Sequence, residues 1–467
     1  MMHPRAGYGG GGLVAFLARH EWRVLSSSAI TRVVLVVFAM VLLIAGLLGA
    51  ARTLRERETV RTFEQRAVQQ RLQTTAIRAD VAANERGWLA LLPPSALAAL
   101  AVGQGDVYPN YIKVTARSLD AMVSGDQIEH PQAVASGAFD VAFVILFLYP
   151  LLIFAISFDL TASERDRGTL RMVLSQPVTL GQVVAGKMIV RALILAVPVV
   201  AIPIAVAATA SPLDAQFVLR GVTWTMAVLV YGFVWHGLAL VVNARGLSAP
   251  ANALVLAGLW LLLSVVGPSF VNLAIAVQYP MPSRVQAAVE ARNATQEATV
   301  QGSQQLGQFL QDHPTSANVG RDGMRQFAML QASRDQRVAD RLQAVEASFD
   351  AQLRRQRQLA SWLSLLSPTM VAQVALLDIA GASTYRFDHF REAVSVFQRD
   401  WRSFFEPRVL DAATLTPAEY AAAPTWHYQP ELPVFMINRV MLRVVALAAL
   451  AAVLWWVGFK RYEGYQL

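Results

Sequence analysis

Six long apolar runs, each bounded by charged or small polar residues, dominate the pattern of the chain. A helix needs about 20 residues to cross the roughly 30 Å hydrocarbon core of a bilayer, and each run reaches about that length. The pattern therefore predicts six membrane-spanning helices. Their expected ranges are Val33–Ala51, Ala138–Leu160, Met188–Ala210, Val218–Val242, Ala249–Val277 and Val440–Phe459.

Basic residues in the short connections orient these helices. Lys and Arg favour cytoplasmic loops, so the side on which they gather is predicted to face the cytoplasm. They gather after the second, fourth and sixth runs, at Arg165, Arg167, Arg171, Lys187, Arg191, Arg245, Lys460 and Arg461. Both tails, 1–32 and 460–467, are therefore expected in the cytoplasm, together with a loop at 161–187.

The segment that precedes the first run has a different pattern. Residues Leu13–Leu25 alternate apolar and charged side chains at helical spacing, which predicts a helix lying on the membrane surface. The run Val33–Ala51 is longer, and starts later, than the apolar region of a cleavable signal peptide, so we expect it to remain as a span.

Two long segments, 52–137 and 278–438, are predicted to lie on the opposite side of the membrane. Each carries apolar residues at helical spacing, which predicts amphipathic helices able to pack on each other. These residues are Leu54, Val60, Phe63, Val68, Leu72, Ile77 and Val81 in the first segment, and Phe327, Leu330, Val338, Leu342, Val345, Phe349 and Leu353 in the second. The pattern leaves open whether these helices handle a substrate or form a self-contained bundle.

A further apolar stretch, Leu359–Ala382, is a candidate for a seventh span. It contains Pro368, Asp378 and several Ser and Gln residues, which are poorly suited to a lipid-facing helix. We therefore expect an interfacial or re-entrant element.

Composition supports a membrane protein and excludes several other classes. Of 467 residues, 55% are hydrophobic and 15% are charged. The net charge of +8 has no basic block interleaved with aromatic residues, so nucleic-acid binding is not expected. The absence of cysteine excludes disulfides, thiolate metal sites and cysteine nucleophiles. The predicted fold class is an all-α membrane protein with six transmembrane helices and two mainly helical extracytoplasmic insertions.

The loop at 161–187 carries the most informative local pattern. Acidic and basic residues alternate from Glu164 to Arg167, Gly168 follows, and an amphipathic stretch then ends at Pro177. A short helix of this kind can lie across the membrane face and dock on a soluble partner. A cytoplasmic turn whose charges only enforce the topology would show a similar pattern.

This loop also resembles a known family. The stretch Glu164-Arg165-Asp166-Arg167-Gly168-Thr169-Leu170, followed by Leu174-Ser175-Gln176-Pro177 and Gly186-Lys187, is similar to the signature of type-2 ABC exporter permeases. The resemblance implies that this loop forms the coupling helix that contacts an ATPase subunit. The ATPase-coupling residues that it implies are Glu164, Arg165, Asp166, Arg167, Gly168, Thr169, Leu170 and Pro177.

The resemblance has further implications for partners and location. It implies a dimer of cytoplasmic ABC ATPases that binds ATP and Mg, a second permease subunit that is identical or paralogous, and the inner membrane of a bacterium. A pattern in the second outer segment resembles a subgroup annotated with multicopper-enzyme-maturation permeases. Its residues are Tyr385, His389, Phe390, Trp401, Phe405, Pro407, Leu415, Thr416, Tyr420, Pro424 and Tyr428.

Other motifs carry little chemistry. Gly181 to Lys187 matches the start of a phosphate-binding loop, but Met188 replaces the hydroxyl residue that would hold magnesium, and the context is a membrane span. We therefore expect no cofactor and no catalytic site in this chain, and any ATPase activity is expected in a partner subunit. Copper binding is not expected either, because the outer histidines are scattered: His130, His313, His389 and His427.

Ionisable residues near the membrane are candidates for a transport pathway. Most lie close to the end of a span, where their charged groups are expected to reach the interface. These are Asp140, Asp159, Arg191, Arg220 and Arg443. His236 lies deeper and either lines a path or forms a hydrogen bond between helices.

The expected function is that of an ABC permease subunit that exports or translocates an unidentified substrate. Two alternatives stay open at this point. One is an ABC assembly that performs mechanical work on periplasmic proteins, and the other is a membrane-anchored sensor or scaffold.

Overall fold

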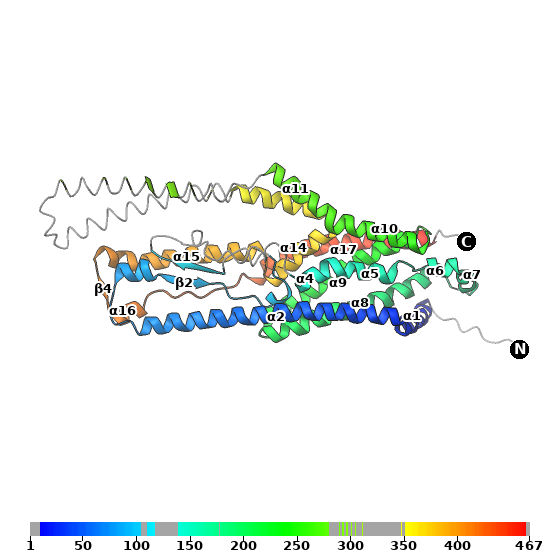
Figure 1. Cartoon of the computed structure of the whole chain (residues 1–467), viewed down its shortest axis with the longest axis horizontal. Coiled ribbons are helices and arrows are strands. Elements are labelled where there is room, and N and C mark those ends of the chain that lie inside the picture. Colours follow the sequence, from blue (N-terminus) through cyan, green and yellow to red (C-terminus); the bar gives the residue numbers. More distant parts are fainter. Residues whose placement is uncertain are drawn as a thin grey trace.

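A computed structural model describes residues 10–103, 110–116, 139–176, 178–279 and 351–463, with a few isolated residues between 280 and 350. The molecule is elongated (Figure 1), with long helices bundled at one end and a smaller domain at the other. We call the smaller part the head domain (residues 52–116 and 384–432), and we call the opposite end of the bundle, which carries α1 (Gly10–Ser27) and the end of the last helix, the base.

The described residues contain six helices long and apolar enough to cross a membrane. This confirms the predicted all-α membrane fold with six spans. The spans are α2 (Ala29–Leu72), α4 to α5 (Val141–Phe143, η4 at Val144–Leu148, Tyr149–Ser157), α8 (Leu180–Ala210), α9 (Ala215–Asn243), α10 to α11 (Ala249–Leu261, η5 at Leu262–Val266, Gly267–Gln278) and α17 (Pro433–Glu463).

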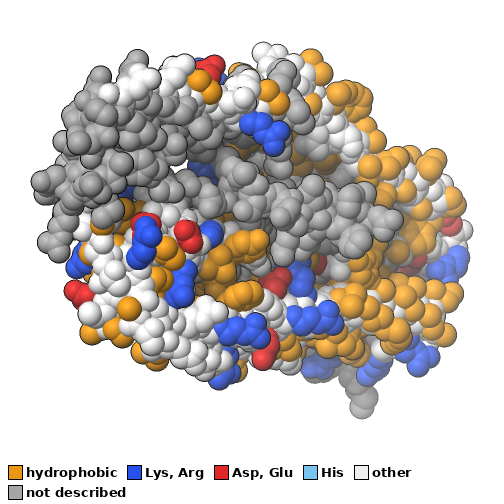
Figure 2. All heavy atoms as spheres, turned by 60° about the vertical axis from the view of Figure 1, so that its left-hand side comes forward, with side chains coloured by type: hydrophobic (Ala, Val, Ile, Leu, Met, Phe, Trp, Pro, Cys, Tyr) orange, Lys and Arg blue, Asp and Glu red, His pale blue; other side chains and the backbone are white. Residues whose placement is uncertain are grey.

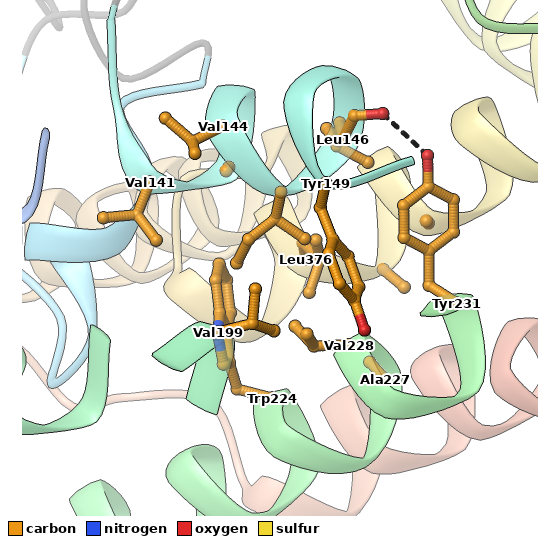
Figure 3. Close-up of a cluster of buried hydrophobic side chains, with 14 of the residues drawn as sticks. Val141, Val144, Leu146, Tyr149, Val199, Trp224, Ala227, Val228, Tyr231 and Leu376 are labelled. Atoms are coloured by element: carbon orange, nitrogen blue, oxygen red, sulfur yellow. Dashed lines mark hydrogen bonds between the residues drawn. The ribbon is translucent and has the colours of Figure 1, made fainter. Parts of the chain in front are cut away.

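Helix α9 is the centre of the bundle. It packs against α5, α8, α14 (Pro368–Ala380) and α17, and in the most apolar windows of α9 and of the second span 61% and 67% of the residues are buried, against 17% for the span Ala249–Gln278. The aromatic side chains of Trp224, Tyr231 and Trp235 are fully buried along α9, and Figure 3 shows the first two among residues of the second span. Hydrophobic side chains gather over part of the surface in Figure 2, as expected where lipid replaces water. Large exposed apolar residues lie on the other spans, among them Val36, Leu193, Leu254 and Leu442.

Helix α2 is much longer than the span predicted at Val33–Ala51. It runs through 44 residues without a break and carries the chain out of the bundle along the head domain (Figure 1). The reason is local, because the residues after the span are mainly Arg, Glu, Gln and Thr, with no Gly or Pro before Leu72. The apolar stripe predicted on this segment is largely exposed, and Ile77 lies in a strand instead.

The head domain joins the two predicted outer segments, which do pack on each other. Its long helix is α15 (Thr384–Leu410), which packs on residues 77–92 and 111–116 of the first segment. The core contains Ile77, Ile112, Phe390, Trp401 and Phe405, all buried. The described part of the predicted stripe between Phe327 and Leu353 is limited to Leu353, and the rest lies outside the described residues.

Two small sheets in the head domain were not predicted. Strand β1 (Ile77–Arg78) pairs antiparallel with β4 (Thr414–Leu415), and β2 (Trp88–Leu91) pairs antiparallel with β3 (Tyr111–Val114). The remaining short elements there are η1 (Val81–Arg86) and α16 (Pro417–Ala421), whereas η2 (Ala98–Leu100) packs on α2 and α8 at the edge of the bundle. Strands of two to four residues carry no readable alternation, which explains why the sequence pattern missed them.

The stretch Leu359–Ala382 forms the end of a helix at residues 351–363, then η7 (Ser364–Leu366) and α14 (Pro368–Ala380). Helix α14 has 13 residues and is therefore about 20 Å long, too short to cross a bilayer. It packs between α9 and α17, with Ala375, Leu376 and Ile379 buried. This burial favours a re-entrant element over one lying on the surface.

A charged cluster connects α14 with the head domain. Arg439 of α17 donates to both carboxylate oxygens of Asp378, at 2.9 and 3.2 Å, and also to Glu431, at 2.6 and 2.8 Å. The hydrogen bonds from Arg439 lower the pKa of Glu431. Arg220 donates to the carbonyls of Asp378 and Ile379 at the end of α14. The cluster therefore ties three bundle helices to the segment that leaves the head domain.

Candidate functional site

The predicted coupling loop forms two short helices at the base, α6 (Ala162–Asp166) and α7 (Thr169–Leu174) (Figure 1). Gly168 lies between them with φ of +73°. A left-handed backbone is costly for residues with a Cβ atom, so glycine is the suitable residue at this turn. The turn sets the direction of α7 relative to α6.

Glu164 points into the protein rather than toward a partner. Its Oε1 lies 2.8 Å from Nζ of Lys187, which comes from the second turn of α8. The same Nζ donates to the carbonyl of Leu160 at 2.7 Å. The pair therefore joins α6, the end of the second span and the start of the third.

Arg165 also makes internal contacts. Its guanidinium donates to the carbonyls of Gly246 and Leu247, in the connection between α9 and α10. These carbonyls follow the end of α9, where cations are favoured by the helix dipole. The α6–α7 loop is thus held against a second loop of the base, 81 and 82 positions away along the chain.

Leu170 anchors α7 to the span helices through apolar packing. It is buried in a small apolar cluster with Leu160, Val184, Leu240 and Tyr462, which come from four other segments of the base. Thr169 Oγ1 donates to the carbonyl of Glu164 at 3.1 Å and closes the turn around Gly168. The buried side of the loop is therefore apolar, and its polar rim is hydrogen-bonded.

The remaining predicted residues form an exposed face. Asp166, Arg167, Gly168 and Thr169 are all exposed, as is Arg171, and Arg167 bonds only to the carbonyl of Ser163 among the contacts described. Pro177, the last of the predicted coupling residues, lies outside the described residues.

Met172 completes this face and was missed by the sequence pattern. It is 77% exposed in the middle of α7, between charged and hydroxyl side chains. An exposed, flexible apolar side chain at the tip of a structured loop is typical of a contact with a partner protein. Its position three residues after Thr169, on the opposite side of α7 from Leu170, could have identified it.

A buried ion pair connects the surface helix to the spans beside this loop. Arg191 of α8 donates to Glu21 of α1 at 2.8 and 3.0 Å, and to the carbonyl of Ile156. Asp159 accepts a weaker contact at 3.3 Å. Arg191 is thus covered by α1 and paired with Glu21, and its role as a boundary residue stays a prediction.

The other ionisable residues near the membrane are likewise held in place. Asp140 is buried and caps α4, accepting from the backbone of Val102 and Phe143. Arg220, near the start of α9, is buried in the cluster around Asp378, so both residues lie at a span end but bond to protein groups, and their role as boundary residues stays a prediction. Arg443 donates to the carbonyl of Arg439 on its own helix.

His236 is fully buried on α9 and bonds to its own helix. Its Nδ1 lies 2.8 Å from the carbonyl of Gly232, and Nε2 has no hydrogen-bond partner among the residues that the structure describes. The hydrogen bond between helices that was expected is therefore not formed, and a role for His236 in a pathway stays a prediction.

The discarded motifs have structural roles. Residues 181–187 are helical within α8, and Lys187 is engaged by Glu164. His389 contacts the carbonyl of Gln429 at 3.2 Å, while His427 is exposed. Within the described residues no group of three or more His, Cys, Asp or Glu could hold a metal. His130 and His313 lie outside that part of the chain.

The geometry defines a polytopic α-helical membrane protein with an anchored two-helix loop at one end of the bundle. A family model described as ABC-2 family transporter protein matches residues 15–463, nearly the whole chain. The chain therefore belongs to the ABC-2 transporter family and is a transmembrane transporter subunit. Membership implies association with an ABC ATPase. No curated protein matches the chain.

Proposed function

We propose that this chain is the permease subunit that couples ATP hydrolysis in a separate ABC ATPase to the export or translocation of a substrate. The observation that carries this proposal is the division of the α6–α7 loop into two faces. Glu164, Arg165 and Leu170 anchor the loop to the span helices, whereas Arg167 and Met172 are presented outward.

This division suits the transmission of force. A partner that moves Met172 and its neighbours also moves three connected parts of the base: the end of the second span, the start of the third, and the connection after the fourth. Because these contacts are short and partly buried, the loop is expected to move as a rigid body with the spans.

The proposed assembly contains two permease subunits, identical or paralogous, and two ATPases in which ATP and Mg are bound. In this assembly the base faces the cytoplasm with both termini, and the head domain lies outside the inner membrane of a bacterium. The basic residues gathered at the base support this orientation. The subgroup associated with multicopper-enzyme maturation stays a prediction, because the aromatic residues of that pattern serve as packing in the head domain.

The first test concerns the turn at Gly168. Gly168→Ala introduces a Cβ that meets no atom within 4 Å but occupies a left-handed backbone, whereas Gly181→Ala meets no atom within 4 Å in an ordinary helix. A cost of roughly 1–2 kcal/mol is expected only at Gly168. The ratio of transported substrate to hydrolysed ATP should therefore fall about tenfold for Gly168→Ala and stay unchanged for Gly181→Ala. Equal ratios for both variants would contradict the role of the turn.

The second test concerns docking. Met172→Glu places a charge at the centre of the exposed face and should abolish co-purification of the ATPase from native membranes. Leu213→Glu is the matched control. Leu213 is 69% exposed in the connection between α8 and α9, which lies at the ends of these helices that are far from the base. Retention of the ATPase by the Met172 variant, or equal loss in both, would exclude docking on this face. The alternative roles as mechanotransmitter or sensor gain no support from these contacts.

A further inference from the structure

The second and fifth spans share an irregular feature. Each contains a π-helical segment, η4 in the second and η5 in the fifth. In η4 the N–H of Tyr149 bonds to the carbonyl of Val144, five residues earlier, and in η5 Gly267 bonds to Leu262 in the same way. Such segments are rare and occur often at functional sites.

A proline follows each π-helical segment. Pro150 and Pro268 lack the N–H that would have continued the backbone hydrogen bonds. Pro150 leaves the carbonyl of Leu146 without its usual partner four residues later, and Pro268 leaves that of Leu263 without its π-helical partner. Inside a membrane an unsatisfied carbonyl costs several kcal/mol, so each must be satisfied from elsewhere.

Side chains of other segments supply the missing donors. The hydroxyl of Tyr231 on α9 donates to the carbonyl of Leu146 at 2.7 Å (Figure 3). Ser367, just before α14, donates to the carbonyl of Leu263. Trp260 Nε1 also donates to the carbonyl of Phe147 at 3.0 Å. Both breaks in the spans are therefore capped by neighbouring helices.

Thr369 connects the cap of the second span to the fifth span. Its Oγ1 lies 3.3 Å from the hydroxyl of Tyr231 and 3.0 Å from Oγ of Ser264, which belongs to η5. Thr369 is 1% exposed and belongs to the first turn of α14. A buried chain of hydroxyls thus runs from the second span to the fifth.

We propose that η4 and η5 are two hinges coupled by Thr369, so that bending of the second span is relayed to the fifth span and to α14. Hydroxyl groups suit this role, because each can donate and accept and can exchange partners at small cost. The source of the bending rests on the proposed function, since α5 leads directly into the α6–α7 loop. The end of α14 carries Asp378, so the relay reaches the cluster at the head domain.

The relay is tested on the full chain alone, in lipid nanodiscs, by amide hydrogen exchange. Tyr231→Phe removes one hydroxyl without changing volume. Exchange should rise about fivefold, the change expected for the loss of one neutral hydrogen bond, both at 144–152 and at 262–271. Tyr149→Phe is the control, because Tyr149 is buried in the second span but donates to neither of these carbonyls.

Thr369 is tested by two variants that differ in a hydroxyl. In a Thr369→Val background the effect of Tyr231→Phe should be confined to 144–152, whereas in a Thr369→Ser background it should again reach 262–271. An effect confined to 144–152 in the unaltered background would overturn the relay. So would an effect at 262–271 that persists in the Thr369→Val background.

A second measurement separates the relay from the proposed function. The chain contains no cysteine, so spin labels can be attached at Leu213→Cys and Val277→Cys without removing native residues. The measured quantity is the distance between the two labels within one chain, in an ATPase complex diluted with unlabelled chain. On addition of ATP this distance should change on the order of 2 Å in the parent and in the Thr369→Ser variant, but not in the Thr369→Val variant. Hydrolysis without a shift in the parent form would refute the relay alone. Failure of the ATPase to bind would refute the proposed function and leave the exchange result standing.

Discussion

Replacing Arg191 by Met is expected to destabilise the protein by about 3–5 kcal/mol. Glu21 is 6% exposed and pairs with Arg191 through two hydrogen bonds, so the substitution leaves a buried carboxylate without its cation. Helix α1 and the end of α5 lose the same anchor. The free energy of unfolding of the full chain in mixed micelles, measured by SDS titration, should show the loss.

Two further variants make this expectation specific. Arg443→Met removes an arginine whose described contact is within its own helix, and should cost less than about 1 kcal/mol. The double variant Glu21→Met with Arg191→Met removes both charges and should recover most of the stability. The reason is that the attraction within a buried ion pair is largely offset by the cost of desolvating its two charges. A double variant as unstable as Arg191→Met would show that the loss has another cause.

Replacing Trp401 by Ala is expected to destabilise the head domain by about 3–5 kcal/mol. Trp401 is fully buried, its ring centroid lies 4.6 Å from that of Phe405 and 6.0 Å from that of Phe397, and its Nε1 donates to the carbonyl of Ala83 at 3.2 Å. The substitution creates a cavity where the two outer segments meet. Limited proteolysis should then cut within 77–116 and 384–432.

Trp456→Ala serves as the matched control. Trp456 is 63% exposed on α17 and contacts Lys460, so its removal should leave proteolysis of the head domain unchanged. Proteolytic resistance of the Trp401 variant would contradict a shared core, and equal sensitivity in both variants would indicate a general loss of stability. Intact spans in the Trp401 variant would also allow ATPase coupling to be measured without a folded head domain.

The six spans could be predicted because lipid imposes a local rule. A backbone inside the hydrocarbon core must satisfy its hydrogen bonds within its own helix, so length and apolarity are sufficient to identify each span. Beyond Ala51 the pattern predicted an amphipathic helix, but nothing in it showed that this helix continues the span without a break to Leu72. Charge and hydropathy do not encode where a continuous helix leaves the membrane.

The candidate site was predicted in position but not in the role of its residues. Glu164 and Arg165 were grouped with Arg167 as one charged turn, yet the first two contact Lys187 and the 246–247 carbonyls while Arg167 is exposed. These partners are remote in the sequence and become neighbours only after the spans pack. Met172 was overlooked because an apolar residue on a short amphipathic helix resembles part of the buried face.

The sequence alone determined the membrane class, the number of spans, the side on which the basic loops gather and the position of the loop at 161–187. Each depends on properties read within about 25 neighbouring residues. The buried pair Glu21–Arg191, the paired breaks in the second and fifth spans and the head-domain core became visible only in the folded chain. Their partners lie far apart, as with Tyr231 and Thr369, 138 positions from each other, and packing alone brings them into contact.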